Sequence, residues 1–175
     1  MTRTTNARTA GVTFLVYIAA GIASMVLARR GQPTELLTAI TSFAALVLGV
    51  TLYAITRDED RDLALLALAC RIVEAVPGVS GALYFAVGST IFAWLLLRGR
   101  MIPLPLAWLG VAASVLLVVL LIVQRAGLFA GALNWSSATT WIVWLPMLVF
   151  EVALALWFIV KGVAAPAGAR ETVRS

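Results

Sequence analysis

The chain has 175 residues, of which 62% are hydrophobic and 12% are charged, and its net charge is +5. Soluble domains are about 45–50% apolar and about 25% charged, so this chain has more apolar side chains than one soluble domain can bury. The composition excludes a disordered chain, a secreted disulfide scaffold and an ordinary soluble enzyme, and it predicts a membrane protein. The basic residues stand singly between apolar blocks, which favours membrane lipids as partners and not nucleic acid.

The residue types that are missing limit the chemistry further. The sequence has no histidine, which excludes His-ligated haem, zinc sites that need histidine, and Ser–His or Cys–His catalytic pairs. Its one cysteine, Cys70, excludes internal disulfides and thiolate clusters. No glycine-rich phosphate-binding motif occurs. We therefore expect no cofactor, no metal and no enzymatic activity.

Apolar blocks predict the membrane-spanning helices. Four blocks have 17 to 22 residues, enough for one transmembrane helix each: 11–27, 36–56, 104–123 and 139–160. The first block also resembles a secretory signal peptide, and we favour an uncleaved span. Pro103 and Pro105 open the 104–123 block, where proline suits the first turn of a helix. A loop is expected between residues 124 and 138.

The remaining block, 63–97, is too long for one span. Its 35 residues would form a helix of about 52 Å, whereas the hydrocarbon core is about 30 Å thick. Pro77 and Gly78 lie at its middle and break helices. We predict two short helices, about 61–76 and 81–97, joined by a tight turn. The expected fold is all-α, a polytopic bundle of six transmembrane helices.

The basic residues favour six spans over five. With six spans and a cytoplasmic N-terminus, nine basic residues are cytoplasmic and three are outside, whereas five spans would leave five inside and seven outside. The positive-inside rule then places both termini in the cytoplasm. The nine are Arg3, Arg8, Arg57, Arg61, Arg98, Arg100, Lys161, Arg170 and Arg174, and the three are Arg29, Arg30 and Arg125.

This topology defines the expected organisation of the chain. Residues 1–10 form a cytoplasmic N-terminal segment, 11–162 the transmembrane domain, and 163–175 a flexible cytoplasmic tail. Aromatic residues near the expected helix ends are typical of membrane interfaces. Those near cytoplasmic ends are Tyr53, Trp94, Trp108 and Trp157, and those near the outer end of the last helix are Trp135 and Trp141.

Three ionisable residues lie inside the predicted spans. Arg71 and Glu74 are one turn apart in the third helix, at a spacing that lets their side chains touch. Glu151 lies in the last helix. Arg71 is ten residues from Arg61, and Glu151 is ten residues from Lys161, so both lie about 15 Å from the cytoplasmic end. This shared depth makes an Arg71–Glu151 ion pair possible near the middle of the membrane.

The third helix carries a stripe of small and polar residues, which marks contact with other helices and directs its charged groups inward. The stripe consists of Ala64, Ala67, Arg71, Glu74 and Gly78. One arginine and two glutamates leave one excess negative charge, which a bound cation or a proton relieves. Arg71, Glu74 and Glu151 are therefore candidate binding residues for a ligand, cation or proton. The alternative is a structural clamp between the third and sixth helices.

Two further features have simpler readings. The acidic run 58–62 begins like a calcium loop but lacks its glycine and closing glutamate, so we predict a solvated loop with an aspartate capping the third helix. Cys70 is expected to be a small buried apolar residue.

Four segments resemble the polytopic bacterial membrane proteins grouped as domain of unknown function 4386. They are Ala7-Arg8-Thr9-Ala10-Gly11, LALLALACRIVEA at 63–75, GSTIFAWLLLRGRMIPLPLAWLG at 88–110 and FEVALALWFIVKG at 150–162. Arg71 and Glu74 fall in the second segment, and Glu151 falls in the fourth. The resemblance implies a multi-pass protein of the bacterial inner (plasma) membrane and carries no reaction with it.

Three functions follow as hypotheses. The first is a non-enzymatic structural or accessory subunit beside a larger membrane assembly, which short loops and the lack of a soluble domain favour. The second is a small-molecule, lipid or ion-binding, transporter-like protein that uses Arg71, Glu74 and Glu151. The third is an intramembrane enzyme, which is disfavoured because no nucleophile–base set is recognisable. The ligand, any protein partner and the oligomeric state are not encoded in a recognisable motif.

Overall fold

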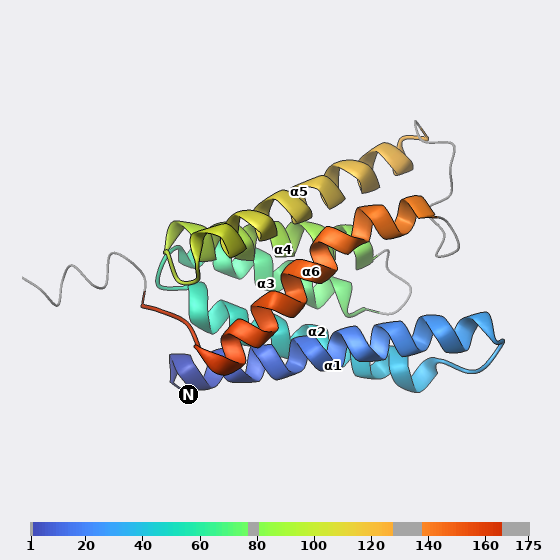
Figure 1. The fold of residues 1–175 in the computed structure, drawn as a ribbon, viewed down its shortest axis with the longest axis horizontal. Coiled ribbons are helices and arrows are strands. Elements are labelled where there is room, and N and C mark those ends of the chain that lie inside the picture. Colours follow the sequence, from blue (N-terminus) through green and yellow to red (C-terminus); the bar gives the residue numbers. More distant parts are fainter. Residues whose placement is uncertain (1, 77–80, 128–137, 166–175) are drawn as a thin grey trace, which may run out of the picture.

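The computed structural model describes residues 2–76, 81–127 and 138–165, and these residues form six α-helices and no strand. The all-α prediction is therefore confirmed (Figure 1). In chain order the helices are α1 (Arg3–Arg29), α2 (Glu35–Thr56), α3 (Arg61–Glu74), α4 (Gly81–Arg98), α5 (Leu104–Arg125) and α6 (Ala138–Val160).

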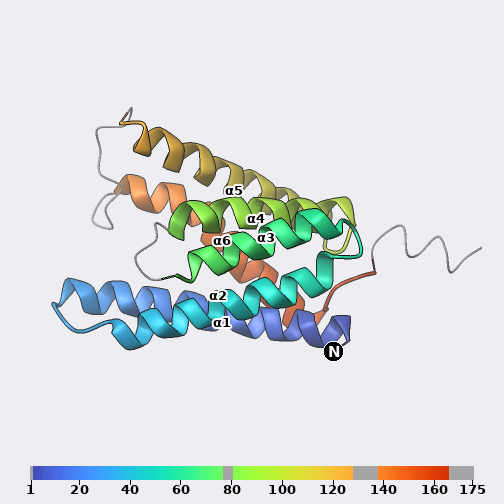
Figure 2. The same ribbon diagram turned by 180° about the vertical axis from the view of Figure 1, so that it is seen from behind.

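Consecutive helices run antiparallel and pack against one another, and α6 returns to pack on α1. Figures 1 and 2 show that α1 begins where α6 ends, at the same end of the bundle. We call this the termini end. The opposite end holds the α1–α2 connection and the start of α4. Which side of the membrane the termini end faces stays a prediction.

Five helices are long and apolar enough to cross a membrane, and α3 is the exception with 14 residues. Its length of about 21 Å is less than the hydrocarbon thickness. It nevertheless runs along most of α4, as Figure 2 shows. Asp60, which precedes α3, lies 3.5 Å from Arg98 at the end of α4, and Glu74 at the other end packs on Gly81. The 63–97 block is thus divided into two antiparallel helices, as predicted.

Local signals fix the starts of the helices. The Asp60 carboxylate accepts a hydrogen bond from the Leu63 N–H at 3.1 Å and caps α3, which confirms the predicted cap. Thr2 caps α1 by accepting from the Thr5 N–H, so α1 starts eight residues before the apolar block at Gly11. The predicted turn at 77–80, most of the loop at 124–138 and the tail from 166 lie outside the described residues.

The helix order separates the basic residues as the charge count requires. Of the described basic residues other than Arg71, seven lie at or near the termini end and three near the opposite end. Arg170 and Arg174 lie outside the described residues. Trp94 and Trp108 near the termini end and Trp141 near the opposite end are each at least 40% exposed. Side chains placed in this way fit an aromatic belt at both membrane interfaces.

Close packing of α1 on α6 depends on Gly11. A Cβ atom at this position would lie 2.7 Å from the Ala155 carbonyl oxygen and 3.2 Å from Phe158 Cβ. Backbone atoms cannot move aside as a flexible side chain can, so the contact requires glycine. At Gly21, ten residues along the same helix, an added Cβ would meet nothing within 4 Å. Figures 1 and 2 show that the two helices lie together near the termini end and diverge toward the opposite end.

We predict that Gly11→Ala lowers the free energy of unfolding by about 1 to 3 kcal/mol, the usual cost of overpacking. Thermal unfolding in a mild detergent measures this loss. Gly21→Ala is the matched control in the same helix and is expected to leave the melting temperature unchanged or slightly raised. Equal loss in both variants would contradict the role of the α1–α6 contact.

The topology predicts that reporters fused before residue 3 and after Val160 give the same cytoplasmic signal. A reporter fused after Gly31, in the connection at the opposite end, is expected to give the opposite signal. Paired reporters that are active on one side of the membrane only make this measurement. Signals from the two termini that differ would overturn the even number of crossings.

Candidate ligand-binding site

Arg71 is the centre of the buried polar site. It is 1% exposed and lies on α3, facing α2, α4 and α6. Its Nη1 donates to Glu74 Oε2 at 2.9 Å, and its Nη2 donates to Ser89 Oγ on α4 at 3.1 Å. The guanidinium carbon also lies 4.8 Å from the centre of the Phe85 ring, within cation–π range. The predicted contact between Arg71 and Glu74 is confirmed.

Two glycines let the neighbouring helices approach α3 closely enough to surround this charge. A Cβ at Gly49 of α2 would lie 2.9 Å from Arg71 Cβ, and a Cβ at Gly88 of α4 would lie 3.0 Å from Cys70 Cβ. Leu65 and Leu66 on the other side of α3 are more than half exposed. The inward direction predicted for Arg71 is confirmed, and Cys70 is buried as expected.

Glu74 links α3 to α1. Its Oε2 accepts from Arg71, while its Oε1 accepts a hydrogen bond from the Tyr17 hydroxyl at 2.7 Å. The Tyr17 ring in turn stacks on Phe85, with centroids 6.3 Å apart and planes 7° from parallel. Both carboxylate oxygens of Glu74 therefore have a partner, and its charge is balanced by Arg71.

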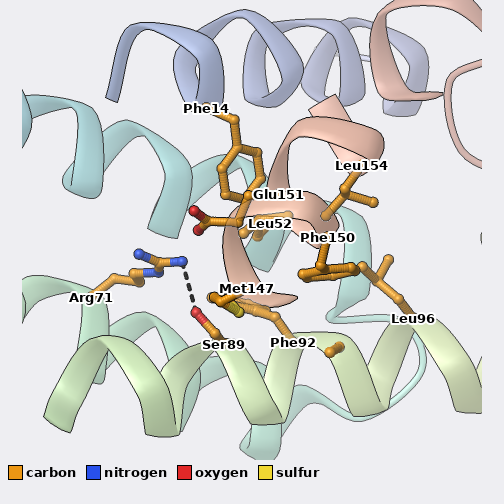
Figure 3. A pocket seen from close by; sticks show the side chains of 11 residues that line it. Phe14, Leu52, Arg71, Ser89, Phe92, Leu96, Met147, Phe150, Glu151 and Leu154 are labelled. Atoms are coloured by element: carbon orange, nitrogen blue, oxygen red, sulfur yellow. Dashed lines mark hydrogen bonds between the residues drawn. The ribbon is translucent and has the colours of Figure 1, made fainter. Parts of the chain in front are cut away.

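Glu151 reaches the same site from α6 and is balanced differently. It is 5% exposed, and among the described residues its Oε1 has no hydrogen-bond partner. Figure 3 shows its carboxylate directed toward Arg71 across a small pocket that also contains Ser89. The shared depth of Arg71 and Glu151 is therefore confirmed. No ion pair within 4.0 Å joins them in the described part of the chain.

The small pocket has a volume of about 10 Å³, the size of one water molecule. Arg71 Nε, like Glu151 Oε1, is a buried polar atom without a partner among the described residues. Arg71, Ser89 and Glu151 supply polar groups around this space, so a single water molecule could bridge the two charged side chains.

A much larger cavity lies beside the small pocket, where α1 diverges from α6. Its volume is about 910 Å³, near the upper end of the range for small-molecule sites. We call it the cleft. Its walls come from α1, α2, α4 and α6 and from the end of α3, and they include Tyr17, Gly21, Glu74, Phe85, Trp144 and Glu151. Glu151 thus belongs to both cavities, and the two glutamates line the cleft together.

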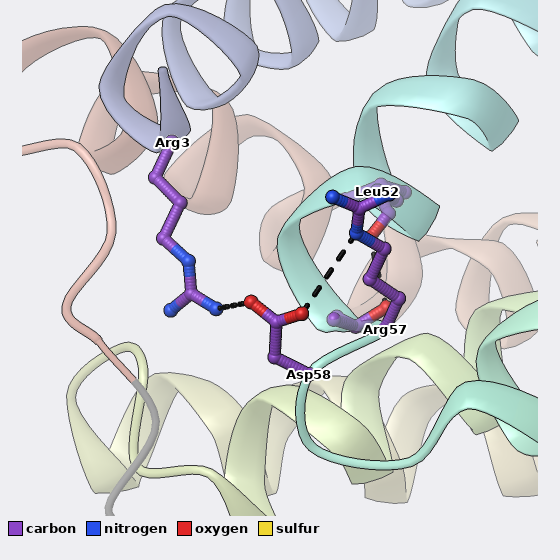
Figure 4. Close-up of polar contacts among 5 residues, drawn as sticks. Arg3, Leu52, Arg57 and Asp58 are labelled. Atoms are coloured by element: carbon purple, nitrogen blue, oxygen red, sulfur yellow. Dashed lines mark hydrogen bonds and ion pairs between the residues drawn. The ribbon is translucent and has the colours of Figure 1, made fainter. Parts of the chain in front are cut away.

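Packing and ion pairs close the bundle at the termini end. Arg3 of α1 lies 2.6 Å from Asp58, which also faces Arg57 at 3.8 Å (Figure 4). Arg98 of α4 pairs with Glu59 at 3.1 Å. The acidic run therefore faces basic side chains at the helix ends, and the described residues contain no cluster of three or more potential metal-ligating side chains.

The sequence identified the charged residues of the site but missed Tyr17, Phe85 and Ser89. A signal for Ser89 was present, because an antiparallel helix pair that turns near residue 80 places positions 71 and 89 opposite each other. No comparable signal exists for Tyr17, which lies on a helix far away in the chain.

A model of the family described as "Domain of unknown function (DUF4386)" matches residues 78–162, which confirms the resemblance seen in the sequence. The match covers α4 to α6 with Phe85, Ser89 and Glu151, and it begins after Arg71 and Glu74. Neither a curated protein nor a solved structure matches the chain.

We predict that Arg71→Met lowers the free energy of unfolding by about 3 to 5 kcal/mol, because two buried carboxylates lose their cation. Adding Glu74→Gln to this variant is expected to restore part of the loss, since one of those charges is then removed. Denaturant titration in mild detergent measures both effects, with Arg30→Met at an exposed position as the control. A double variant no more stable than Arg71→Met would contradict the pairing.

Proposed function

We propose that this chain, which matches the DUF4386 family model over residues 78–162, is a membrane protein that binds a small amphipathic molecule in the cleft and catalyses no reaction. One observation carries the proposal: Glu151 is buried, has an unpartnered carboxylate oxygen, and lines a cavity of about 910 Å³. Ionisable groups at this depth in a membrane are costly and typically mark a ligand or ion pathway.

The structural clamp between α3 and α6 accounts for this arrangement less well. A clamp is strongest with a direct Arg71–Glu151 contact, whereas Arg71 donates hydrogen bonds to Glu74 and Ser89 and packs its guanidinium against Phe85. With all three groups ionised, one positive and two negative charges leave a net charge of −1. Glu151 is the carboxylate without a direct partner, so a ligand that supplies a positive charge or a hydrogen-bond donor would stabilise this group most.

The cleft also favours ligand binding over the accessory role predicted from the short loops. A subunit that only packs beside another membrane protein needs an exposed surface and gains nothing from a large cleft with two carboxylates. The accessory role and membership of a larger assembly stay predictions. A location in the plasma membrane of a bacterium, with cytoplasmic termini and a cleft that opens toward the outer side, belongs to the proposal.

Native mass spectrometry of the protein extracted in a mild detergent tests ligand binding. We expect a non-protein mass to remain bound to the wild-type chain and to be lost in Gly21→Phe. Gly21 lines the cleft and has open space around it, so a phenyl ring there enters the cleft without a backbone clash and obstructs it. Ala19→Phe is the matched control, because Ala19 lies on the exposed side of the same helix.

Glu151→Gln separates ligand binding from the clamp. If Glu151 binds a ligand, the variant loses the bound mass and keeps its melting temperature when the ligand is absent. If Glu151 is a clamp, the ligand-free variant melts at a lower temperature. A wild-type protein without bound mass, whose stability also falls in Glu151→Gln, would overturn the proposal. A bound protein chain in place of a small molecule would support the accessory role.

A further inference from the structure

We infer that the cleft selects an organic cation, a molecule with an ammonium-type head and an apolar body, over anionic and uncharged molecules of the same shape. This inference rests on the proposed function and names the chemical class of its ligand. Two independent features of the cleft support it. One is an excess of negative charge at its inner end, which is the end that adjoins the small pocket, and the other is a wall of aromatic rings beside that charge.

The charge at the inner end comes from two carboxylates on different helices. Glu74 and Glu151 both line the cleft, while Arg71 lies behind them in the small pocket and faces Glu74, Ser89 and Phe85. With both glutamates ionised, Arg71 balances one of the two negative charges, so a monovalent cation in the cleft would make the site neutral. An anionic head would add to the existing excess in a region with little screening by solvent.

Arg29 lies near the opposite end and does not cancel this charge. It lines the cleft on α1, twelve residues beyond Tyr17, which corresponds to about 18 Å along the helix. The negative charge of the cleft therefore lies at its inner end, away from Arg29. A cationic head is favoured next to Glu151, with the rest of the molecule directed away from it.

The aromatic wall lies next to the carboxylates. Tyr17, Phe85 and Trp144 form a row in which the Tyr17 and Phe85 centroids are 6.3 Å apart and the Phe85 and Trp144 centroids are 5.8 Å apart. All three residues line the cleft. Aromatic faces attract cations, and the Arg71 guanidinium 4.8 Å from the Phe85 centroid already uses this attraction within the site.

The same features disfavour an inorganic cation. Calcium takes six to eight oxygen ligands, and magnesium requires a compact octahedral set. The described walls of the cleft offer two carboxylates, one of which already accepts hydrogen bonds through both oxygens, and the hydroxyl groups of Ser24, Thr38, Thr41 and Ser42. The described residues gather no cluster of three or more potential metal ligands. A cavity of about 910 Å³ with a mainly apolar wall instead fits a large, weakly hydrated cation.

Three probes with the same octyl chain test this selectivity: octyltrimethylammonium, octanesulfonate and octanol. Binding is measured by equilibrium dialysis of the protein in lipid nanodiscs, with protein-free nanodiscs correcting for uptake into lipid. We expect the ammonium probe to bind about tenfold more tightly than octanol, and octanesulfonate to bind most weakly.

Variants connect this preference to the named side chains. Glu151→Gln is expected to remove most of the difference between the ammonium probe and octanol. Trp144→Leu is expected to weaken ammonium binding several-fold with little effect on octanol. Trp108→Leu is the matched control, because Trp108 is 53% exposed and lies outside the cleft.

The outcomes separate this inference from the proposed function. Octanol that binds as tightly as the ammonium probe, with binding lost in Gly21→Phe, would overturn the preference for cations and leave ligand binding in the cleft intact. Tightest binding of octanesulfonate would also overturn the preference. Failure of all three probes to bind, in a protein that retains no mass in native mass spectrometry, would overturn both.

Discussion

The burial of one positive charge inside the helical bundle constrains the whole structure. Arg71 is almost completely enclosed, and an unpaired arginine in such a place would be strongly unfavourable. Glu74 supplies the counter-charge, Ser89 a hydrogen-bond acceptor and Phe85 an aromatic face. These partners come from α3 and α4, so the short α3 must lie along α4. Gly49 and Gly88 permit the close approach on both sides of α3.

The pairing of Arg71 with Glu74 determines the chemistry left to Glu151. Because Glu74 accepts from both Tyr17 and Arg71, its position is fixed by α1 and α3 together. Glu151 then arrives from α6 as a second carboxylate beside an arginine whose charge is already balanced. A site with one charge too many is unfavourable as permanent structure but useful for binding, since a ligand of opposite charge removes the excess.

The sequence predicted the helices and the charged residues because both depend on local signals. Pro77 and Gly78 predicted a break in the long apolar block, Asp60 marked the start of α3, and the spacing of Arg71 and Glu74 predicted their contact. The cleft could not be predicted, because it depends on how far α1 diverges from α6. That angle is set where Gly11 meets Ala155, a contact between residues 144 positions apart. Hydropathy patterns carry no information about such a pair.

The two ends of the bundle are held by different interactions, and this difference bears on how a ligand would leave. At the opposite end the helices diverge around the cleft, while at the termini end Gly11 packs on α6. The ion pairs there, Arg3 with Asp58 and Arg98 with Glu59, involve partly exposed side chains and contribute little stability. Apolar packing of α1 on α6 therefore closes this end. A carrier would have to separate that glycine contact, whereas a binding protein would keep it, so the contact distinguishes the two mechanisms.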